Sequence, residues 1–370
     1  MKVLVADELS PEGLETLRRA PGLTVEVRTG LKPGDLKAIV GEYDALAVRS
    51  ATRVTAEVLE NPGRLKLIGR AGVGVDNIDV EAATRKGVVV MNTPGGNAVA
   101  VAELTVGLML ALHRQLVPAI SATKSGKWEK KRFAKGHELF RKTVGLVGFG
   151  TIGQLVAQRC IAFGTTVIAY DPHPVEASRR LGVQIVPMDE LFRRADIVSL
   201  HLPLMENTRN LVGSKLLGSM KKGSYLVNCA RGGIVDEAAL AAALRGGTLA
   251  GAAMDVFATE PVPPDHPLLS LESFLCTPHL GASTEEGQLA CANQLAEQLV
   301  EYAETGHVRH ALNAPAHLGC VETQAVLMEA SRNGSSAPGP LPGRRPCRPR
   351  RRSCPLAARP TLHDGCSVCA

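Results

Sequence analysis

Two blocks of the chain alternate short apolar runs with segments of helical periodicity. In the first hundred residues the apolar runs are KVLVAD, TVEVR, ALAVRS, LKLIGRAG and VVVMN. Between residues 143 and 279 they are TVGLVG, TVIAYD, DIVSLHLP, SYLVNCA, GAAMDVF and FLCTPH. Strands that alternate with helices usually pair in parallel, with helices on both faces of the sheet. The pattern therefore predicts an α/β fold with two doubly wound parallel-sheet domains.

A break and two long helical segments organise these blocks. NTPGGN at residues 92–97 interrupts the pattern and predicts a hinge, and the apolar segment AVAVAELTVGLMLALHRQL after it predicts a buried connecting helix. A second helix is predicted after His279, because Ser283 and Glu286 have the spacing of a capping box and Gly306 is a suitable stop. We expect this second helix to return to the first domain and make that domain discontinuous.

The last part of the chain has a different composition. Residues 314–370 contain the sequence SSAPGPLPGRRPCRPRRRSCP and show no apolar period, so we expect a disordered tail. The tail holds eight Arg, no Lys and three acidic residues, which accounts for +5 of the total net charge of +6. Since the remaining chain is nearly neutral, the charge does not indicate nucleic-acid binding by the folded part, and we expect none.

The cysteines indicate a reducing compartment. Four of the nine are scattered singly through apolar segments, as is typical of buried free thiols: Cys160, Cys229, Cys276 and Cys291. Cys366 and Cys369 form a lone CxxC without a second ligand pair, so we predict no metal site. The first apolar run begins at Lys2, and no apolar run approaches the roughly 20 residues of a membrane span. We therefore expect a cytoplasmic protein without a membrane partner.

A glycine-rich turn points to a dinucleotide. Gly148, Gly150 and Gly153 have the GxGxxG spacing after an apolar run, which allows a tight bend, a close backbone approach to a pyrophosphate and close helix packing. The pyrophosphate would lie at a helix N-terminus, where free N–H groups favour negative charge. Asp171 ends the next run, eighteen positions after Gly153, where it can accept a hydrogen bond from a ribose 2′-hydroxyl and repel a 2′-phosphate. The sequence predicts NAD rather than NADP.

Three charged residues follow three consecutive predicted strands of the second block. Arg231 follows VNCA, Glu260 follows DVFAT and His279 follows FLCTP. Ligands of open α/β sheets bind at the carboxyl ends of the strands, so these side chains could converge beside the dinucleotide. An arginine can bind a carboxylate, a histidine can exchange a proton, and a carboxylate can orient that histidine. These groups suit the oxidation of a 2-hydroxy acid.

The motifs together resemble a known family. GFGTIG, NCARGGIVDE at 228–237, AMDVF, the EP pair at 260–261 and TPHLGAST at 277–284 resemble the D-2-hydroxyacid dehydrogenase family. VRSATRVT at 48–55, GRAGVGVDNIDVEAATRKG at 69–87 and MNTPGGN are similar to the members that act on 3-phosphoglycerate. The resemblance runs from Met1 to about residue 314. It implies NAD-dependent oxidation of 3-phosphoglycerate to 3-phosphohydroxypyruvate, the first step of phosphorylated serine biosynthesis.

The resemblance assigns roles to individual residues. It implies that His279 accepts the proton of the C2 hydroxyl, that Glu260 is its partner, and that Arg231 grips the substrate carboxylate. Arg49 and Arg70 resemble the contacts of the substrate anion, and the resemblance places Ser50 beside them. Further implied cofactor contacts are Val73, Thr151, Ile152, Leu202, Cys229, Ala230, Asp255, His279, Gly281 and Ala282.

The same resemblance implies a division into domains. Residues 1–95 and 281–313 would form a flavodoxin-like substrate-binding domain, and residues 96–280 a Rossmann NAD-binding domain, followed by the tail. Members of the family are commonly dimers, so a homodimer through the NAD-binding domain is expected. In that case Trp128, Lys130, Lys131 and Arg132 either reach a neighbouring cleft or form a solvated basic loop.

The chain departs from its relatives at three places, and other readings stay open. Val73 stands where animal members have Thr in GRAGTGVDN, and Gly95 replaces the Asn of NTPNGN. The animal members also continue into further domains that the tail does not resemble. One alternative is another member of the family, such as a hydroxypyruvate or glyoxylate reductase. A second is an NAD-binding scaffold like the C-terminal-binding corepressors.

Overall fold

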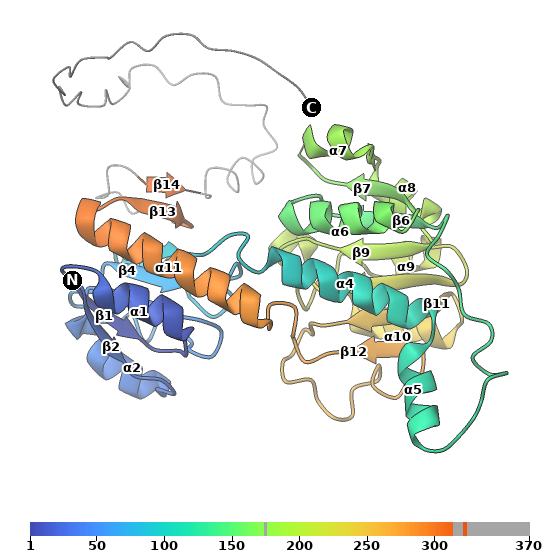
Figure 1. The fold of residues 1–370 in the computed structure, drawn as a ribbon, viewed down its shortest axis with the longest axis horizontal. Coiled ribbons are helices and arrows are strands. Elements are labelled where there is room, and N and C mark those ends of the chain that lie inside the picture. The colour runs from blue at the N-terminus through green and yellow to red at the C-terminus, as the bar shows by residue number, and fades with distance from the viewer. Residues whose placement is uncertain (174–175, 314–320, 324–370) are drawn as a thin grey trace, which may run out of the picture. The chain divides into compact units, whose positions relative to one another are not determined.

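The computed structural model describes residues 1–173, 176–313 and 321–323. Within these residues the chain forms two seven-stranded sheets, each covered by helices (Figure 1). The predicted fold class, two α/β domains with parallel sheets, is confirmed. The predicted disorder of the tail concerns residues that lie outside the described ones, apart from 321–323.

The first sheet has the strand order β14-β13-β5-β4-β3-β1-β2. Its strands are β1 (Lys2–Val5), β2 (Thr24–Val27), β3 (Ala45–Val48), β4 (Leu67–Arg70), β5 (Val89–Met91), β13 (Val308–Ala311) and β14 (Val321–Thr323). Its helices are α1 (Pro11–Arg19), α2 (Pro33–Ile39), α3 (Val80–Arg85) and α11 (Glu285–Thr305), with a 3-10 turn η1 (Val40–Glu42). The strands alternate apolar side chains between two cores: Val3 and Val5 pack toward α1 and α11, and Leu4 packs toward α2.

Two details of this sheet correct the expectations. The sheet is not wholly parallel, because β13 pairs antiparallel with β5. The chain returns to the sheet directly after α11, and a single antiparallel strand at the edge of a parallel sheet is common. In addition, Val321–Thr323 lies within the tail expected to be disordered, yet it forms β14 and pairs with β13. The backbone of β13 offers an edge there, and two of these three residues are of the β-branched type that favours strands.

The second sheet has the order β12-β11-β10-β9-β6-β7-β8 and is parallel throughout. Its strands are β6 (Thr143–Val147), β7 (Thr166–Tyr170), β8 (Gln184–Ile185), β9 (Ile197–Leu200), β10 (Ser224–Asn228), β11 (Leu249–Met254) and β12 (Phe274–Cys276). Its helices are α4 (Ala98–His113), α5 (Leu116–Lys124), α6 (Thr151–Ala162), α7 (Glu176–Leu181), α8 (Met188–Arg194), α9 (Ser214–Ser219) and α10 (Glu237–Arg245), with a 3-10 turn η2 (Glu206–Thr208). The chain runs outward from β6 through β7 to β8, and then from β9 to β12 on the other side. This reversal creates a crevice at the carboxyl ends of β6 and β9.

The connecting helix is shorter than predicted. α4 ends at His113 rather than continuing through the apolar pattern, because Gln115 has a left-handed backbone with φ 49° and α5 starts in a new direction. α4 is buried over most of its surface, as its apolar sequence requires. Among the described residues no single helix is long and apolar enough to cross a membrane. α4 and α5 reach that length only as a pair that is bent by 67°.

α11 carries the chain back to the first sheet, as predicted, and packs against α1. Its N-terminal cap is Thr284, whose Oγ1 accepts from Gly287 N over 3.0 Å, and not the expected Ser283. Gly306 ends the helix with φ 72°, in the left-handed conformation expected of it. The boundaries that divide the chain near residues 95 and 280 stay predictions.

Candidate functional site

The glycine-rich turn lies between β6 and α6. Gly148 has φ 98°, and a Cβ there would lie 2.5 Å from the backbone oxygen of His201. A Cβ on Gly153 would lie 2.4 Å from Gly148 O, so the start of α6 packs directly on the turn. Gly150 is the N-cap residue of α6, no side chain caps the helix, and a Cβ there would meet no atom within 4 Å. The turn therefore leaves an open helix N-terminus, which is a suitable place for an anion.

Asp171 follows β7 and contacts the same turn. Its Oδ2 accepts from Phe149 N over 2.7 Å, and its Oδ1 accepts from His173 N over 2.9 Å. A carboxylate can accept further hydrogen bonds beyond these two. Asp171 thus holds the middle of the glycine turn in place and retains the capacity to accept from a ribose hydroxyl.

The three predicted catalytic residues extend from neighbouring strands. Arg231, Glu260 and His279 follow β10, β11 and β12, which are adjacent in the sheet. His279 Nδ1 lies 2.7 Å from Glu260 Oε2, and Phe257 N donates to Glu260 Oε1 over 2.9 Å. With Nδ1 directed at the carboxylate, Nε2 is the ring nitrogen that is left to exchange a proton.

Asp255 fixes the turn that presents His279. Its Oδ1 accepts from Thr277 Oγ1 and from Leu280 N, and its Oδ2 accepts from Gly281 N over 2.7 Å. His279 N also donates to Asp255 O over 2.9 Å, and His279 has the left-handed φ of 57°. Asp255 was predicted as a cofactor contact. Its hydrogen bonds show that this buried carboxylate holds the Thr277 side chain before His279 and the backbone after it.

One cleft of about 560 Å³ brings most of the predicted residues together. Those that line it are Arg49, Ser50, Arg70, Val73, Ile152, Leu202, Cys229, Ala230, Arg231, Asp255, Glu260, His279, Gly281 and Ala282. Those that do not line it are Gly148, Gly150, Thr151, Gly153 and Asp171. The second group belongs to the glycine turn and to the end of β7, where the other end of a long ligand would extend.

Three arginines line this cleft. Arg70 donates from Nε to Asn77 Oδ1 over 3.3 Å, and Arg49 donates from Nη1 to Glu8 O over 3.1 Å. Burial lowers the pKa of Arg70 from its ordinary value, and the positive charge of Arg231 lowers it further. Since an arginine stays protonated in a protein, the cleft concentrates positive charge and favours an anion with more than one charge.

Comparison with known proteins decides the family. Residues 106–281 match the model of the D-isomer specific 2-hydroxyacid dehydrogenase, NAD-binding domain. The chain is 47% identical over 317 residues to D-3-phosphoglycerate dehydrogenase of Methanocaldococcus jannaschii, covering 85% of this chain and 60% of that relative. It is 45% identical over 341 residues to the Homo sapiens D-3-phosphoglycerate dehydrogenase, covering 89% and 63%.

The chain is also similar to a solved structure that contains NAD. The NAD-dependent formate dehydrogenase from Staphylococcus aureus in complex with NAD is 33% identical, with a TM-score of 0.71 and coverage of 82% of this chain and 95% of that one. The chain belongs to the D-isomer specific 2-hydroxyacid dehydrogenase family. The second sheet thus lies within a matched NAD-binding domain, and the predicted cofactor class is confirmed. The chain spans about 60% of the length of the curated relatives it matches.

The cleft of this family member also contains residues that the sequence analysis missed. His201 follows β9 and lines the cleft, and Gln288 and Cys291 reach it from α11. The position of His201 directly after a strand was a signal, since the three catalytic candidates were found by the same rule. Gln288 and Cys291 are three positions apart and so share a helix face, but the direction of that face depends on how α11 crosses the sheet.

The cysteines agree only partly with the prediction. Cys160, Cys229 and Cys291 are buried free thiols, and burial raises the pKa of Cys160 and of Cys229 to about 12. Cys276 is exposed, contrary to the expectation, because it is the last residue of the edge strand β12. Within the described part of the chain, no group of three His, Cys, Asp or Glu side chains could hold a metal ion. The CxxC pair lies outside the described residues.

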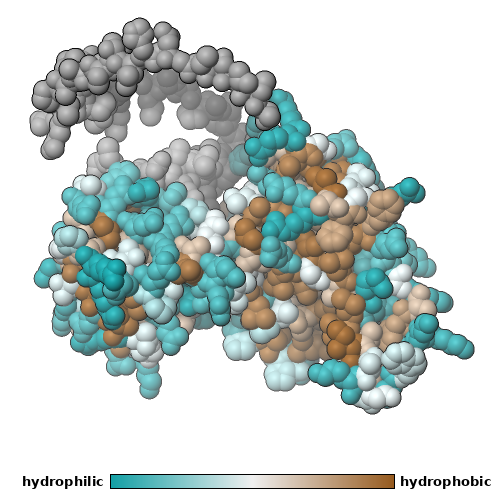
Figure 2. Space-filling model, viewed as in Figure 1, coloured by the Kyte–Doolittle hydropathy of each residue, from teal (hydrophilic) through white to brown (hydrophobic). Residues whose placement is uncertain are grey.

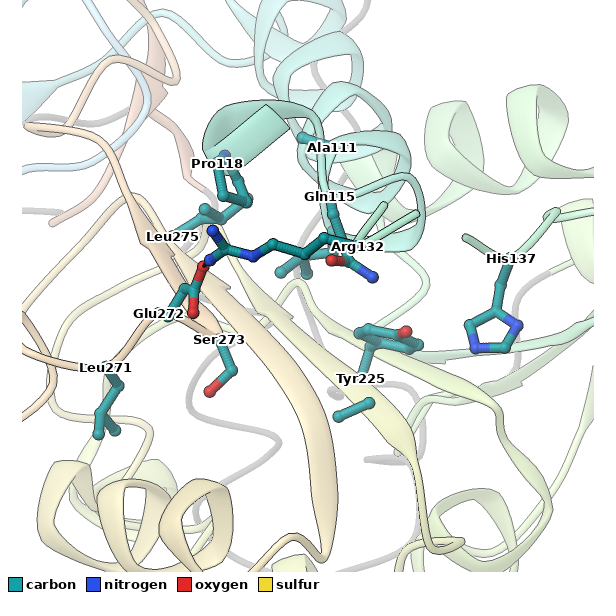
Figure 3. Close-up of a pocket in the computed structure, with 12 residues that line it drawn as sticks. Ala111, Gln115, Pro118, Arg132, His137, Tyr225, Leu271, Glu272, Ser273 and Leu275 are labelled. Carbon is teal, nitrogen blue, oxygen red and sulfur yellow. Dashed lines mark hydrogen bonds and ion pairs between the residues drawn. The ribbon is translucent and has the colours of Figure 1, made fainter. Parts of the chain in front are cut away.

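A second cavity, of about 510 Å³, lies at the opposite end of the sheet from Arg231, Glu260 and His279. Tyr225 and Ser273 line it at the amino ends of β10 and β12, and Pro118 lines it from α5. Figure 3 shows the Arg132 side chain directed across this cavity toward Glu272, with which it forms an ion pair. Because Arg132 also pairs with Glu129, its charge is already neutralised, and the cavity carries no catalytic constellation.

Proposed function

We propose that this protein oxidises 3-phosphoglycerate to 3-phosphohydroxypyruvate with NAD, the first step of phosphorylated serine biosynthesis. The single observation that carries the proposal is a His279–Glu260 pair in a cleft that is also lined by three arginines. The substrate carries a carboxylate and a phosphate, and three cationic side chains match that charge. The names of the relatives that align over most of this chain support the same substrate.

In this proposal each catalytic candidate has one task. Glu260 accepts from His279 Nδ1, so the lone pair of His279 Nε2 is available to take the proton of the C2 hydroxyl. Arg231 binds the substrate carboxylate and fixes C2 relative to His279. The glycine turn and the cleft would hold NAD, which would supply the acceptor for the hydride of C2. The oxidised product keeps its carboxylate and its phosphate. Its release therefore breaks the contacts with the same arginines that bound the substrate.

Arg49 and Arg70 suit the phosphate. Arg49 follows β3 and Arg70 ends the neighbouring strand β4. Asn77 links their loops by accepting from Arg70 Nε and donating to Arg49 O over 2.8 Å. A guanidinium binds a phosphate through two parallel hydrogen bonds. Ser50 lines the cleft beside Arg49 and offers a hydroxyl to the same group.

The cofactor residues fit a dinucleotide. The uncapped N-terminus of α6 would bind the pyrophosphate through backbone N–H groups at Gly150, Thr151 and Ile152. Asp171 would accept from the adenosine ribose. The remaining candidates line the cleft near His279 and would surround the nicotinamide end: Val73, Leu202, Cys229, Ala230, Asp255, Gly281 and Ala282.

The proposal includes a homodimer formed through the NAD-binding domain. Val117 and Ile120 of α5 and Val99 of α4 are each at least half exposed, and Trp128 is 83% exposed. Figure 2 shows hydrophobic residues gathered on the half of the view in which α4 and α5 lie. Exposed apolar area of this kind is typical of subunit interfaces. Light scattering should give a dimer, and Ile120→Glu should shift it toward monomer.

A cytoplasmic location completes the proposal. It is supported by the buried, unpaired thiols Cys160, Cys229 and Cys291 in the described part of the chain. Localisation of the tagged full chain tests it, and a signal confined to another compartment would contradict it.

The decisive experiment measures NADH formation by the purified chain with 3-phosphoglycerate. His279→Ala should lower kcat by roughly 10² to 10⁴-fold, the usual contribution of a general base, and should leave NAD affinity nearly unchanged. His307→Ala is the matched control, because His307 pairs with a carboxylate, Glu301, at the C-terminal end of α11. Unchanged kcat in His279→Ala would contradict the assignment. A wild-type preference for hydroxypyruvate or glyoxylate would instead favour a reductase, and NAD binding without turnover a scaffold.

A further inference from the structure

Two carboxylates accept from consecutive backbone N–H groups just after β11. Phe257 N donates to Glu260 Oε1 over 2.9 Å, and Ala258 N donates to Glu237 Oε1 over 2.7 Å. Glu260 directs its other oxygen to His279, at 2.7 Å. Glu237 therefore contacts the Glu260 loop, residues 257–268, immediately beside the bond that fixes Glu260.

Glu237 also contacts the far end of this loop. Its Oε2 lies 3.0 Å from His266 Nε2, and Leu268 N donates to His266 Nδ1 over 3.4 Å. The side chains of Glu237 and His266 are each only 15% exposed, so water competes weakly for these bonds. One carboxylate thus joins residue 258 to residue 266 and closes the loop.

Helix capping does not explain this arrangement. The N-terminus of α10 is capped by Asp236, whose Oδ1 accepts from Ala238 N over 3.1 Å and from Ala239 N over 3.0 Å. A shielded carboxylate–imidazole pair is also weak evidence for stability, because desolvation offsets much of its attraction. Neither helix capping nor stability therefore explains why Glu237 contacts the loop.

The segment that carries Arg231 packs on the same loop. A Cβ on Gly232 would lie 1.8 Å from Phe257 O, so the segment with Arg231 and Glu237 lies directly on the Glu260 loop. Only a glycine permits this approach. The relative position of Arg231 and Glu260 is thus set by one tightly packed junction, in which Glu237 supplies the hydrogen bonds.

We propose that Glu237 and His266 are positioning residues, which hold the Glu260 loop so that Glu260 keeps His279 oriented. Neither residue lines the cleft, so they act through Glu260 rather than on the substrate. The proposal rests on the roles given above to His279 and Glu260. It assigns a function to the DE pair at residues 236–237, of which Asp236 caps the helix and Glu237 serves the site.

Kinetics test the path through Glu260. Glu237→Ala should lower kcat by about 10- to 100-fold, as a misplacement of about 1 Å does, and should leave KM for the acid and the Kd for NAD within about twofold. Glu237→Gln keeps an oxygen for Ala258 N but turns its NH₂ group toward the Nε2–H of His266, so it should recover only part of kcat. In a Glu260→Gln background, Glu237→Ala should lower kcat little further, because Glu237 acts on the reaction only through Glu260. Additive losses, or an unchanged kcat in Glu237→Ala, would overturn the proposal.

Amide hydrogen exchange tests it without relying on activity. Residues 257–268 should exchange faster in Glu237→Ala, and His266→Asn should show the same change if the Ala variant folds poorly. His307→Ala, which breaks a carboxylate–imidazole pair at the C-terminal end of α11, should leave this loop unchanged. Unaltered exchange in both Glu237→Ala and His266→Asn would overturn the proposal. If the wild type turns over a different D-2-hydroxy acid, only the proposed substrate fails, and the kinetic cycle is run with that acid.

Discussion

Arg231 donates from Nε to Asp76 Oδ2 over 3.0 Å and so joins the segment after β10 to a loop of the first sheet. Its Nη1 donates to Ala230 O over 2.7 Å. A Cβ on Gly74 would lie 1.9 Å from Arg231 Nη2, so the guanidinium packs directly on the Gly74 backbone and would have to move for a larger residue. A bidentate grip on a carboxylate needs two donors on one edge of the guanidinium. Asp76 occupies one of those donors.

We predict that Asp76 competes with the substrate for Arg231. Asp76→Asn should lower KM for the hydroxy acid by about two- to fivefold with kcat nearly unchanged, since exposed ion pairs contribute about 0.2–1 kcal/mol. The difference should shrink at high salt, because the side chain of Asp76 is 64% exposed. Steady-state kinetics at two ionic strengths measure this. A higher KM in Asp76→Asn would mean that Asp76 orients Arg231 for binding.

The arginines of the first sheet should discriminate between substrates. Arg49→Ala or Arg70→Ala should raise KM for 3-phosphoglycerate by about tenfold or more, since a hydrogen bond to a charged group contributes about 1.5–3 kcal/mol. KM for unphosphorylated D-glycerate should change little. Arg53→Ala is the matched control, because Arg53 is exposed on the same segment and does not line the cleft. Equal losses with both substrates would indicate damage to the fold instead of loss of a phosphate contact.

Much of the fold follows from local patterns in the sequence. The β-branched runs predict the six longer strands of the second sheet, and Gly306 predicts the end of α11. The two-residue strand β8 is too short to show a period. The break after α4 depends on the backbone of Gln115, which adopts φ 49° although glutamine has no preference for it. The antiparallel β13 depends on where α11 returns, which is a property of tertiary packing.

The candidate site divides in the same way. Arg231, Glu260 and His279 could be found because each follows a strand, and parallel strands end at one edge of the sheet. The hydrogen bonds of Asp255 to Leu280 and Gly281 could not be found, since they depend on the conformation of the turn after β12. The contact of Glu237 with Ala258 likewise joins segments about twenty residues apart. Such contacts become visible only when the loops are placed in space.

Cofactor choice gives a further prediction, because Asp171 has two tasks. Asp171→Ala should weaken NAD binding and reduce the difference in affinity between NAD and NADP, since a hydroxyl acceptor and a repulsive charge are removed together. It should also lower stability, because Phe149 N and His173 N lose their acceptor. Asp196→Ala is the control: Asp196 accepts from Thr143 N at the other end of β6, so its loss should destabilise the sheet without changing cofactor preference. Titration of both cofactors and thermal melting separate the two effects.

The last prediction concerns stability in mild acid, for which His201 is the responsible group. His201 Nε2 lies 3.0 Å from Ser199 Oγ, while its Nδ1 is buried without a hydrogen-bond partner among the described residues. Burial lowers the pKa of His201 from 6.5 to about 4. Between these values the unfolded chain binds a proton that the folded protein does not, so stability is lost as the pH falls through this range. From about pH 7 to about pH 5 the loss of unfolding free energy from this one group should be on the order of 2 kcal/mol.

His201→Leu removes the titrating ring and should flatten this pH dependence of stability in urea unfolding, whereas the exposed control His173→Leu should keep the wild-type slope. A wild-type slope in His201→Leu would mean that the ring is protonated in the folded protein or reached by water.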